Sequence, residues 1–255
     1  MVSPQLLYAD LLSLAAALGA FRLGVADMEP LSGLPTLRQA QGTARPVGLL
    51  SRFRRGISLA VRLDDAVLDG LLPSQNPHPG EPTPAYARLY EAANRHLDGM
   101  ALHLARFLEG RGYRAEAIPA SQTLERQCGA LSHKAVARQA GMGWIGRNLL
   151  LIVPGAGPRV RLATVLTDAL LPAGAPIPGS CGRCRRCIRA CPAGALRYVP
   201  YEEYPDRSAA LDVEACAGRL ECFRQDPRIG HPVCGICLAV CPAGRTVHSS
   251  PPHRP

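Results

Sequence analysis

Four cysteines lie close together in residues 181–191, spaced as C-x2-C-x2-C-x3-C with a proline directly after the last. They are Cys181, Cys184, Cys187 and Cys191. In bacterial ferredoxins this spacing lets the first three thiolates bind one 4Fe–4S cluster while the fourth reaches a second cluster. The run therefore predicts a site for two iron–sulfur clusters, which needs further cysteines elsewhere in the chain.

Those further cysteines recur at a constant offset of 50 residues. Three cysteines and the Pro-Ala-Gly that follows the last of them are repeated, so that Cys184 matches Cys234, Cys187 matches Cys237 and Cys191 matches Cys241. Two matched halves predict two clusters with crossed fourth ligands. One cluster is then expected at Cys181, Cys184, Cys187 and Cys241, and the other at Cys191, Cys234, Cys237 and one more ligand.

The repeat does not supply that last ligand, because His231 stands where the second half would have its first cysteine. Cys216 and Cys222 lie upstream and are both free for this role. We favour Cys216, with Cys222 second and His231 third, since histidine is an uncommon ligand of such clusters.

Structural zinc is the alternative interpretation of these cysteines. Zinc sites typically use two separated pairs of ligands. A triple run that ends in Cys-Pro and has a matched partner favours iron–sulfur clusters instead.

Fixed positive charge surrounds the first run, and no carboxylate lies between residues 177 and 199. The formal net charge of the chain is +9, and two clusters with deprotonated thiols would lower it to about +5. The charge could offset that of the clusters and raise their reduction potential, or it could form a nucleic-acid-binding patch. The arginines concerned are Arg183, Arg185, Arg186, Arg189 and Arg197.

The first 175 residues must form the elements that position this site. Apolar periodicity predicts helices over 5–18, 85–110 and 132–140, and strands over 57–63, 113–119, 149–153 and 160–167. Helices and strands that alternate along the chain indicate a mixed α/β layer. A segment rich in proline and glycine at 171–179 predicts three parts, namely an α/β domain (1–174), a ferredoxin-like domain (175–245) and a tail (246–255).

The composition favours a cytoplasmic protein. No apolar run approaches the roughly 20 residues that a membrane span needs. The apolar N-terminal stretch has no basic lead and contains Asp10, which indicates an amphipathic helix rather than a signal peptide. Ten cysteines without a secretory signal indicate a reducing compartment.

Residues 141–146 read Gly-Met-Gly-Trp-Ile-Gly and match the dinucleotide-binding pattern G-x-G-x-x-G. That pattern requires a strand before it and a helix after it. Here the predicted order is reversed, so we reject a dinucleotide site.

The stretch 133–171 and the cysteines after it resemble the epoxyqueuosine reductase family, and most closely its shorter double-cluster iron–sulfur members. The resemblance is carried by Ala-Gly-Met-Gly-Trp-Ile-Gly-Arg-Asn at 140–148 and by the first cysteine run with its Pro-Ala-Gly-Ala-Leu. It is weaker over 86–98. The resemblance implies an α/β domain similar to that of reductive dehalogenases, followed by a domain with two 4Fe–4S clusters.

The resemblance also implies a base-off cobalamin in the α/β domain, reached by electrons that pass through both clusters. It further implies an electron donor of the flavodoxin or ferredoxin type. It also implies a small-molecule or nucleoside-like substrate. The cobalamin enters through the resemblance alone, because no residue pattern in the chain independently indicates it.

Two departures from the family pattern concern the substrate. Members carry an acidic proton donor just before the segment that matches 140–148, whereas Glu125 is the only carboxylate here between residues 117 and 140. The sequence also ends fourteen residues after Cys241, without the helical repeats of many members. Both departures argue against a tRNA substrate.

The start of the helix expected at 132–140 offers a replacement proton donor. Lys134 is the only lysine among the 29 lysines and arginines, and an ammonium can give up a proton where a guanidinium cannot. Ser132 is the expected N-cap, so His133 and Lys134 lie at the positive end of the helix dipole. The candidate catalytic residues are Lys134, His133 and Glu125, against the alternative of a solvated helix start.

Three functions from different classes fit these observations. We favour an iron–sulfur reductase with a substrate of its own. The first alternative is an electron carrier or reductive activator for a partner's cofactor, and the second is an RNA-binding module with structural clusters.

Overall fold

The computed structural model describes residues 3–33, 52–121, 131–199 and 207–244. Glu125 and the tail 246–255, both named above, lie outside the described residues.

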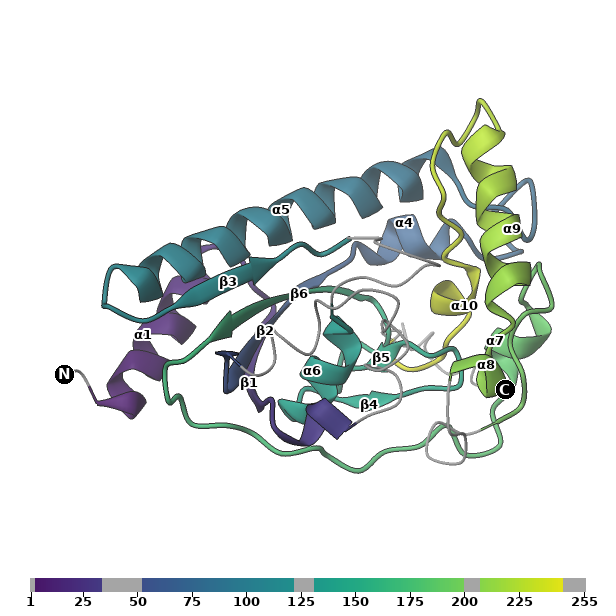
Figure 1. The fold of residues 1–255 in the computed structure, drawn as a ribbon. Helices are drawn as coiled ribbons and strands as arrows, with labels where there is room; N and C mark the ends of the chain where they lie inside the picture. Colours follow the sequence, from purple (N-terminus) through teal and green to yellow (C-terminus); the bar gives the residue numbers. More distant parts are fainter. Residues whose placement is uncertain (1–2, 34–51, 122–130, 200–206, 245–255) are drawn as a thin grey trace, which may run out of the picture.

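A four-stranded antiparallel sheet forms the centre of the molecule (Figure 1), with the spatial order β1-β2-β6-β3. The strands are β1 (Arg22–Asp27), β2 (Arg55–Arg62), β3 (Ala115–Ile118) and β6 (Val160–Thr167). The two central strands, β2 and β6, are buried along almost their whole length. A sheet buried in this way must be covered on both faces.

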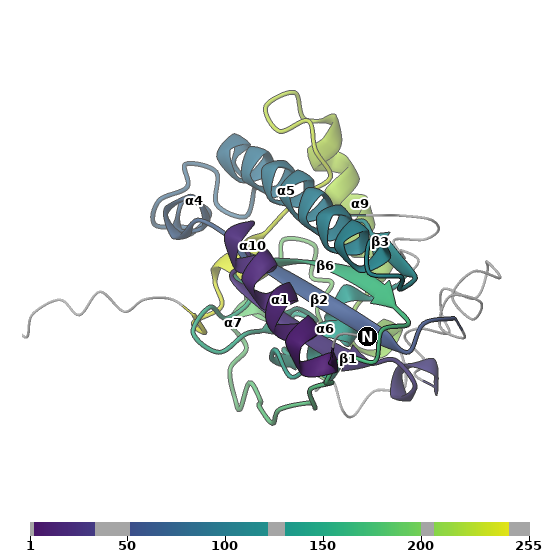
Figure 2. The ribbon, with the colours of Figure 1, turned by 90° about the vertical axis from the view of Figure 1, so that its left-hand side faces the viewer.

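Helices cover both faces of the sheet, and the side chains of β2 show which helix covers which face. Ile57, Leu59 and Val61 belong to the apolar cluster that contains α1 and α5, whereas Ala60 belongs to the cluster that contains α6. This alternation is the period of two that a strand imposes. Figures 1 and 2 show the same arrangement of α1 (Pro4–Ala17), α5 (Pro84–Glu109) and α6 (His133–Gln139). No helix in the described ranges is long and apolar enough to cross a membrane.

Side-chain caps fix where these helices begin. The hydroxyls of Ser3, Thr83 and Ser132 accept hydrogen bonds from backbone N–H groups three residues further on, at 3.2, 3.2 and 3.4 Å. Such caps satisfy N–H groups that have no partner within the helix. The prediction of Ser132 as an N-cap is confirmed.

The cysteine-rich part folds into short helices gathered at one end of α5 (Figure 1). They are α7 (Arg186–Arg189), α8 (Arg207–Ala210), α9 (Val213–Gln225) and α10 (Ile236–Ala239). Their apolar side chains do not form a separate core. Ile236 packs in the cluster of α5, and Leu196 and Leu211 pack in the cluster of α6. The apolar core therefore continues across the boundary expected at residues 174 and 175.

The segment 171–179 is pinned along the α/β layer. The N–H of Gly174 donates a hydrogen bond of 2.8 Å to the carbonyl oxygen of Val25. Gly179 lies so close to the ring of Trp144 that a Cβ at this position would overlap it. The segment thus has fixed contacts although it forms neither helix nor strand.

The segment 141–146 joins α6 to a short hairpin, β4 (Trp144–Ile145) and β5 (Leu151–Ile152). The helix α6 precedes the segment, β4 lies within it and β5 follows it, which is the reverse of the strand-then-helix order that a dinucleotide site needs. Gly143 is needed for packing instead, because a Cβ there would overlap the carbonyl oxygen of Ile152.

Candidate iron–sulfur site

The first group of thiols contains Cys181, Cys184, Cys187 and Cys241. Cys187 lies in α7, and Cys241 follows the end of α10. Burial raises the pKa of the Cys187 thiol to about 11, and the nearby Cys181, Cys241 and Cys184 raise it as well. Burial also raises the pKa of Cys241, with further contributions from Cys181 and Cys184. These mutual effects place the four thiols around one region.

The second group contains Cys191, Cys216, Cys234 and Cys237. Burial raises the pKa of Cys234 to about 11, and Cys191 and Cys216 add to the rise. Burial also raises the pKa of Cys237, which is further affected by Cys234, Cys187, Cys191 and Cys216. The effect of Cys187 on Cys237 shows that the two groups are neighbours.

Cys222 and His231, the other two candidates for the last ligand, have different surroundings from Cys216. Cys222 is exposed on α9, whereas Cys216 on the same helix is half-buried and faces Cys191. The imidazole of His231 lies 3.1 Å from the carboxylate of Glu91, measured from Nδ1 to Oε1.

The chemistry of this donor set fits two 4Fe–4S clusters. Burial disfavours the thiolate form, and neighbouring thiolates repel one another as well, so the pKa values of several of these thiols are raised. Iron ions would offset that repulsion and release the protons on binding. Two groups of four thiols correspond to the four ligands that each cluster takes.

Arg147 fastens the α/β layer to the first group. Its backbone N–H donates to Sγ of Cys181 at 3.4 Å, and its guanidinium donates to the carbonyl oxygens of Gly182 (2.6 Å) and Cys184 (3.2 Å). The guanidinium also lies over the ring of Tyr198, 4.4 Å from its centroid. Hydrogen bonds to sulfur tune the potential of a cluster.

Asn148 makes the corresponding contact with the second group, since its side-chain amide donates to the carbonyl oxygen of Cys237 at 3.1 Å. No role for Arg147 or Asn148 was predicted from the sequence. The only sequence signal for such a role was that both residues end the stretch 140–148, which carries the family resemblance.

A buried arginine lies near Cys241 of the first group. Arg159 is 1% exposed and pairs with Asp65 (2.8 Å) and Asp69 (2.7 Å) of α4 (Asp65–Asp69). Its positive charge lowers the pKa of Cys241, opposing the effect of burial.

The loop that leads to Arg159 packs backbone against backbone on the residues that follow Cys241. Gly157 and Gly244 both have positive φ angles, of 57° and 77°. A Cβ on either residue would overlap the other loop, so glycine is required for this approach.

The start of α6 brings Lys134 close to the second group. The Lys134 ammonium donates to the carbonyl oxygen of Leu149 at 2.6 Å. Burial lowers its pKa to about 8, and the positive charge of Arg207 adds to this, while Cys237 opposes it. Lys134 can therefore exchange a proton closer to neutral pH than an exposed lysine can.

His133 is held at both ring nitrogens. Nε2 lies 2.9 Å from the carbonyl oxygen of Pro119 and Nδ1 lies 2.8 Å from the hydroxyl of Thr164. Because a carbonyl only accepts, Nε2 carries the proton and Nδ1 accepts from the hydroxyl. Burial lowers the pKa of His133 to about 4. These contacts favour a neutral imidazole that fixes the start of α6.

Comparison with known proteins identifies the cysteine-rich part. The family described as "4Fe-4S double cluster binding domain" matches residues 180–244. The epoxyqueuosine reductase of Gloeobacter violaceus is 29% identical over 254 residues, which cover 92% of this chain and 75% of that protein. The epoxyqueuosine reductase of Burkholderia pseudomallei is 32% identical over 236 residues, covering 82% and 55%. The chain spans only 34% of the Bacillus anthracis relative.

Solved structures show the same fold. A catabolic reductive dehalogenase, NpRdhA, in complex with 3-bromo-4-hydroxybenzoic acid matches with a TM-score of 0.69 at 21% identity, over 92% of this chain and 31% of that one. An epoxyqueuosine reductase solved with an epoxyqueuosine-modified tRNA stem loop matches with a TM-score of 0.61 at 20% identity, over 95% and 66%. The expected α/β fold with a two-cluster domain is confirmed.

Proposed function

We propose that the chain, which carries a 4Fe-4S double cluster binding domain and is similar to epoxyqueuosine reductases, is a cytoplasmic reductase. It takes electrons from a donor protein of the flavodoxin or ferredoxin type and delivers them to a substrate at the α/β layer. The observation that carries this proposal is the pair of adjacent thiol groups, tied to that layer through Arg147 and Asn148.

We assign the first cluster to Cys181, Cys184, Cys187 and Cys241, and the second to Cys191, Cys216, Cys234 and Cys237. When bound, the clusters supply one-electron transfer. Both assignments are supported by the pKa values of the thiols, because members of each group raise the pKa of other members of the same group. Around them, Arg147 donates to one ligand sulfur, Asn148 holds the backbone of another ligand, and Arg159 offsets negative charge beside Cys241.

The substrate is small or nucleoside-like, and the argument against tRNA is not borne out. An epoxyqueuosine reductase of the same fold has been solved with a modified tRNA stem loop. That stem loop is the first substrate to test, with chemically reduced protein and detection of the reduced nucleoside by mass. Cluster reduction without turnover on nucleoside-like substrates would favour the electron-carrier function instead.

Cobalamin belongs to this proposal through the resemblance and through a solved reductive dehalogenase of the same fold whose mechanism is B12-dependent. No contact among the described residues identifies a corrinoid site.

We assign proton donation to Lys134, with His133 as a positioning residue and Glu125 as the next acid to test. If Lys134 donates the proton, both Lys134→Arg and Lys134→Met should lower turnover by about 100-fold or more, because arginine is a poor acid. If Lys134 only holds the Leu149 carbonyl, arginine can replace the hydrogen bond and should retain turnover. The iron content of both variants, measured in parallel, should match that of the unmutated protein.

The last cluster ligand can be tested on a single helix. Cys216→Ala should reduce the iron content below eight atoms per chain, because the second cube loses one of its ligands. Cys222→Ala removes an exposed thiol from the same helix and is the matched control, with iron content unchanged. The opposite pattern would move the ligand to Cys222, and no effect of either change would make His231 the candidate.

A further inference from the structure

We propose that the arginine-rich face formed by α7 and the end of α10 is the docking surface for an acidic electron-carrier protein. This inference rests on the proposed function, because it places the donor of that function on the molecule. The surface is defined by Arg183, Arg186, Arg189, Leu72 and Val240, and we call it the α7 face.

The charge of the α7 face is available to a partner. Arg183, Arg186 and Arg189 are exposed, and among the described residues none of the three forms an ion pair with a carboxylate. Other exposed arginines of this chain, such as Arg114 and Arg228, are paired with acids. Unpaired surface charges of one sign create a field that attracts a partner of the opposite sign.

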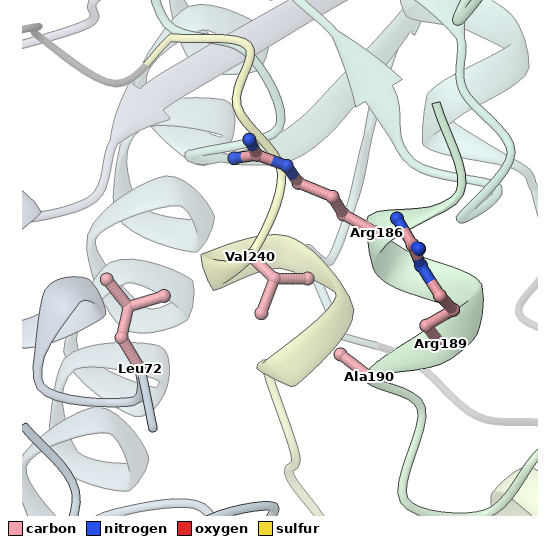
Figure 3. Close-up of a pocket in the computed structure, with 5 residues that line it drawn as sticks. All are labelled: Leu72, Arg186, Arg189, Ala190 and Val240. Carbon is pink, nitrogen blue, oxygen red and sulfur yellow. The ribbon is translucent and has the colours of Figure 1, made fainter. Parts of the chain in front are cut away.

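The α7 face also has an apolar centre. A hollow of about 350 Å³ lies between α7 and α10, lined by Leu72, Arg186, Arg189, Ala190 and Val240. Figure 3 shows the two arginine side chains extending from α7 on one side of Val240, with Leu72 on the other side. Apolar side chains inside a charged rim are the arrangement of a protein–protein interface.

The hollow lies beside ligands of both clusters. Cys187 stands between Arg186 and Arg189 in α7, Cys191 follows Ala190, and Cys241 follows Val240. Cys187 and Cys241 belong to the first group of thiols, and Cys191 belongs to the second. A redox group presented at this hollow would therefore approach both clusters together. In that encounter the donor loses one electron and one cluster gains it, with no atom transferred.

The face fits an acidic protein better than RNA. Single-stranded RNA is bound by basic grooves that also offer aromatic rings for stacking. The hollow is lined by aliphatic and arginine side chains. The nearby Tyr198 is already stacked against the guanidinium of Arg185, 3.7 Å from its ring centroid, and against that of Arg147. Small interfaces with complementary charge suit transient redox encounters.

The test reverses the charge of the face and follows the rate of cluster reduction in reconstituted protein. The double variant Arg186→Glu/Arg189→Glu should slow reduction by reduced flavodoxin, an acidic carrier, about tenfold or more at low salt. It should also abolish the decrease of that rate with added salt. The matched control, Arg95→Glu/Arg106→Glu, makes the same change in net charge on exposed residues of α5 and should retain most of the rate.

A small neutral reductant separates this inference from the proposed function. Photoreduced deazaflavin should reduce the clusters of all three proteins at the same rate, because it needs no docking surface. Equal rates with flavodoxin for the reversed and unmutated proteins would overturn the docking surface while leaving the proposed function intact. Loss of stem-loop binding in the reversed variant, with its flavodoxin rate unchanged, would assign the face to RNA instead. Clusters that deazaflavin cannot reduce in the unmutated protein would overturn the proposed function, and the docking surface with it.

Discussion

Cys237→Ser should remove one of two clusters and lower the iron content from about eight atoms per chain to about four. Burial raises the pKa of Cys237, and four other thiols affect it as well. Cys184→Ser should remove the other cluster. Iron and sulfide analysis after anaerobic reconstitution measures both losses, and electron paramagnetic resonance of the reduced protein shows which cluster remains.

The decisive variant is Cys241→Ser, because Cys241 lies in the second half of the repeat but beside Cys181 and Cys184 of the first. With crossed ligands, its remaining spectrum should match that of Cys184→Ser and differ from that of Cys237→Ser. A match to Cys237→Ser would disprove the crossed arrangement. Four irons or bound zinc in the unmutated protein would disprove the two-cluster assignment itself.

The double variant Asp65→Asn/Asp69→Asn should lower the free energy of unfolding by about 3–5 kcal/mol, because it removes both carboxylates that pair with the buried Arg159. The Arg159 side chain is 1% exposed, whereas the side chains of Asp65 and Asp69 are 32% and 34% exposed. The loss in free energy of unfolding therefore depends on whether the arginine or the two acids are replaced. Chemical denaturation at neutral pH, on protein with the same cluster content, measures it.

Arg159→Met is the matched comparison. It removes the buried charge and leaves two carboxylates that water can reach, so its cost should be smaller than that of the double variant. An equal or larger cost would show that the packing of the arginine side chain, rather than its charge, accounts for the stability of this region.

The sequence predicted the elements with strong apolar patterns. The strand expected at 160–167 is β6, and the helix expected at 85–110 is α5 within one residue. The strand expected at 149–153 shrinks to Leu151–Ile152, because Leu149 adopts a left-handed φ of 57° and closes a turn that begins at Gly146. β1 was missed, since its six residues begin and end with charged side chains and show little alternation.

The candidate site was predictable where spacing along the chain determines it. Seven of the eight predicted ligands follow from one local run and its repeat, whereas Cys216 follows from neither. Arg147 and Asn148 were not predictable, because their partners Gly182 and Cys237 lie 35 and 89 residues away. Contacts at that separation depend on how the hairpin of β4 and β5 meets the cysteine-rich part, which no local pattern encodes.

The pinned segment 171–179 has a kinetic consequence. Many redox proteins carry a cofactor on a tethered domain that swings between donor and acceptor, so that the swing limits the rate. Here the Gly174–Val25 hydrogen bond, the close packing of Gly179 on Trp144 and the continuous core hold the cysteine-rich part in one place. In the proposed function we therefore expect electrons to cross a constant gap inside the chain, and the rate of their delivery to depend on the concentration of the donor protein.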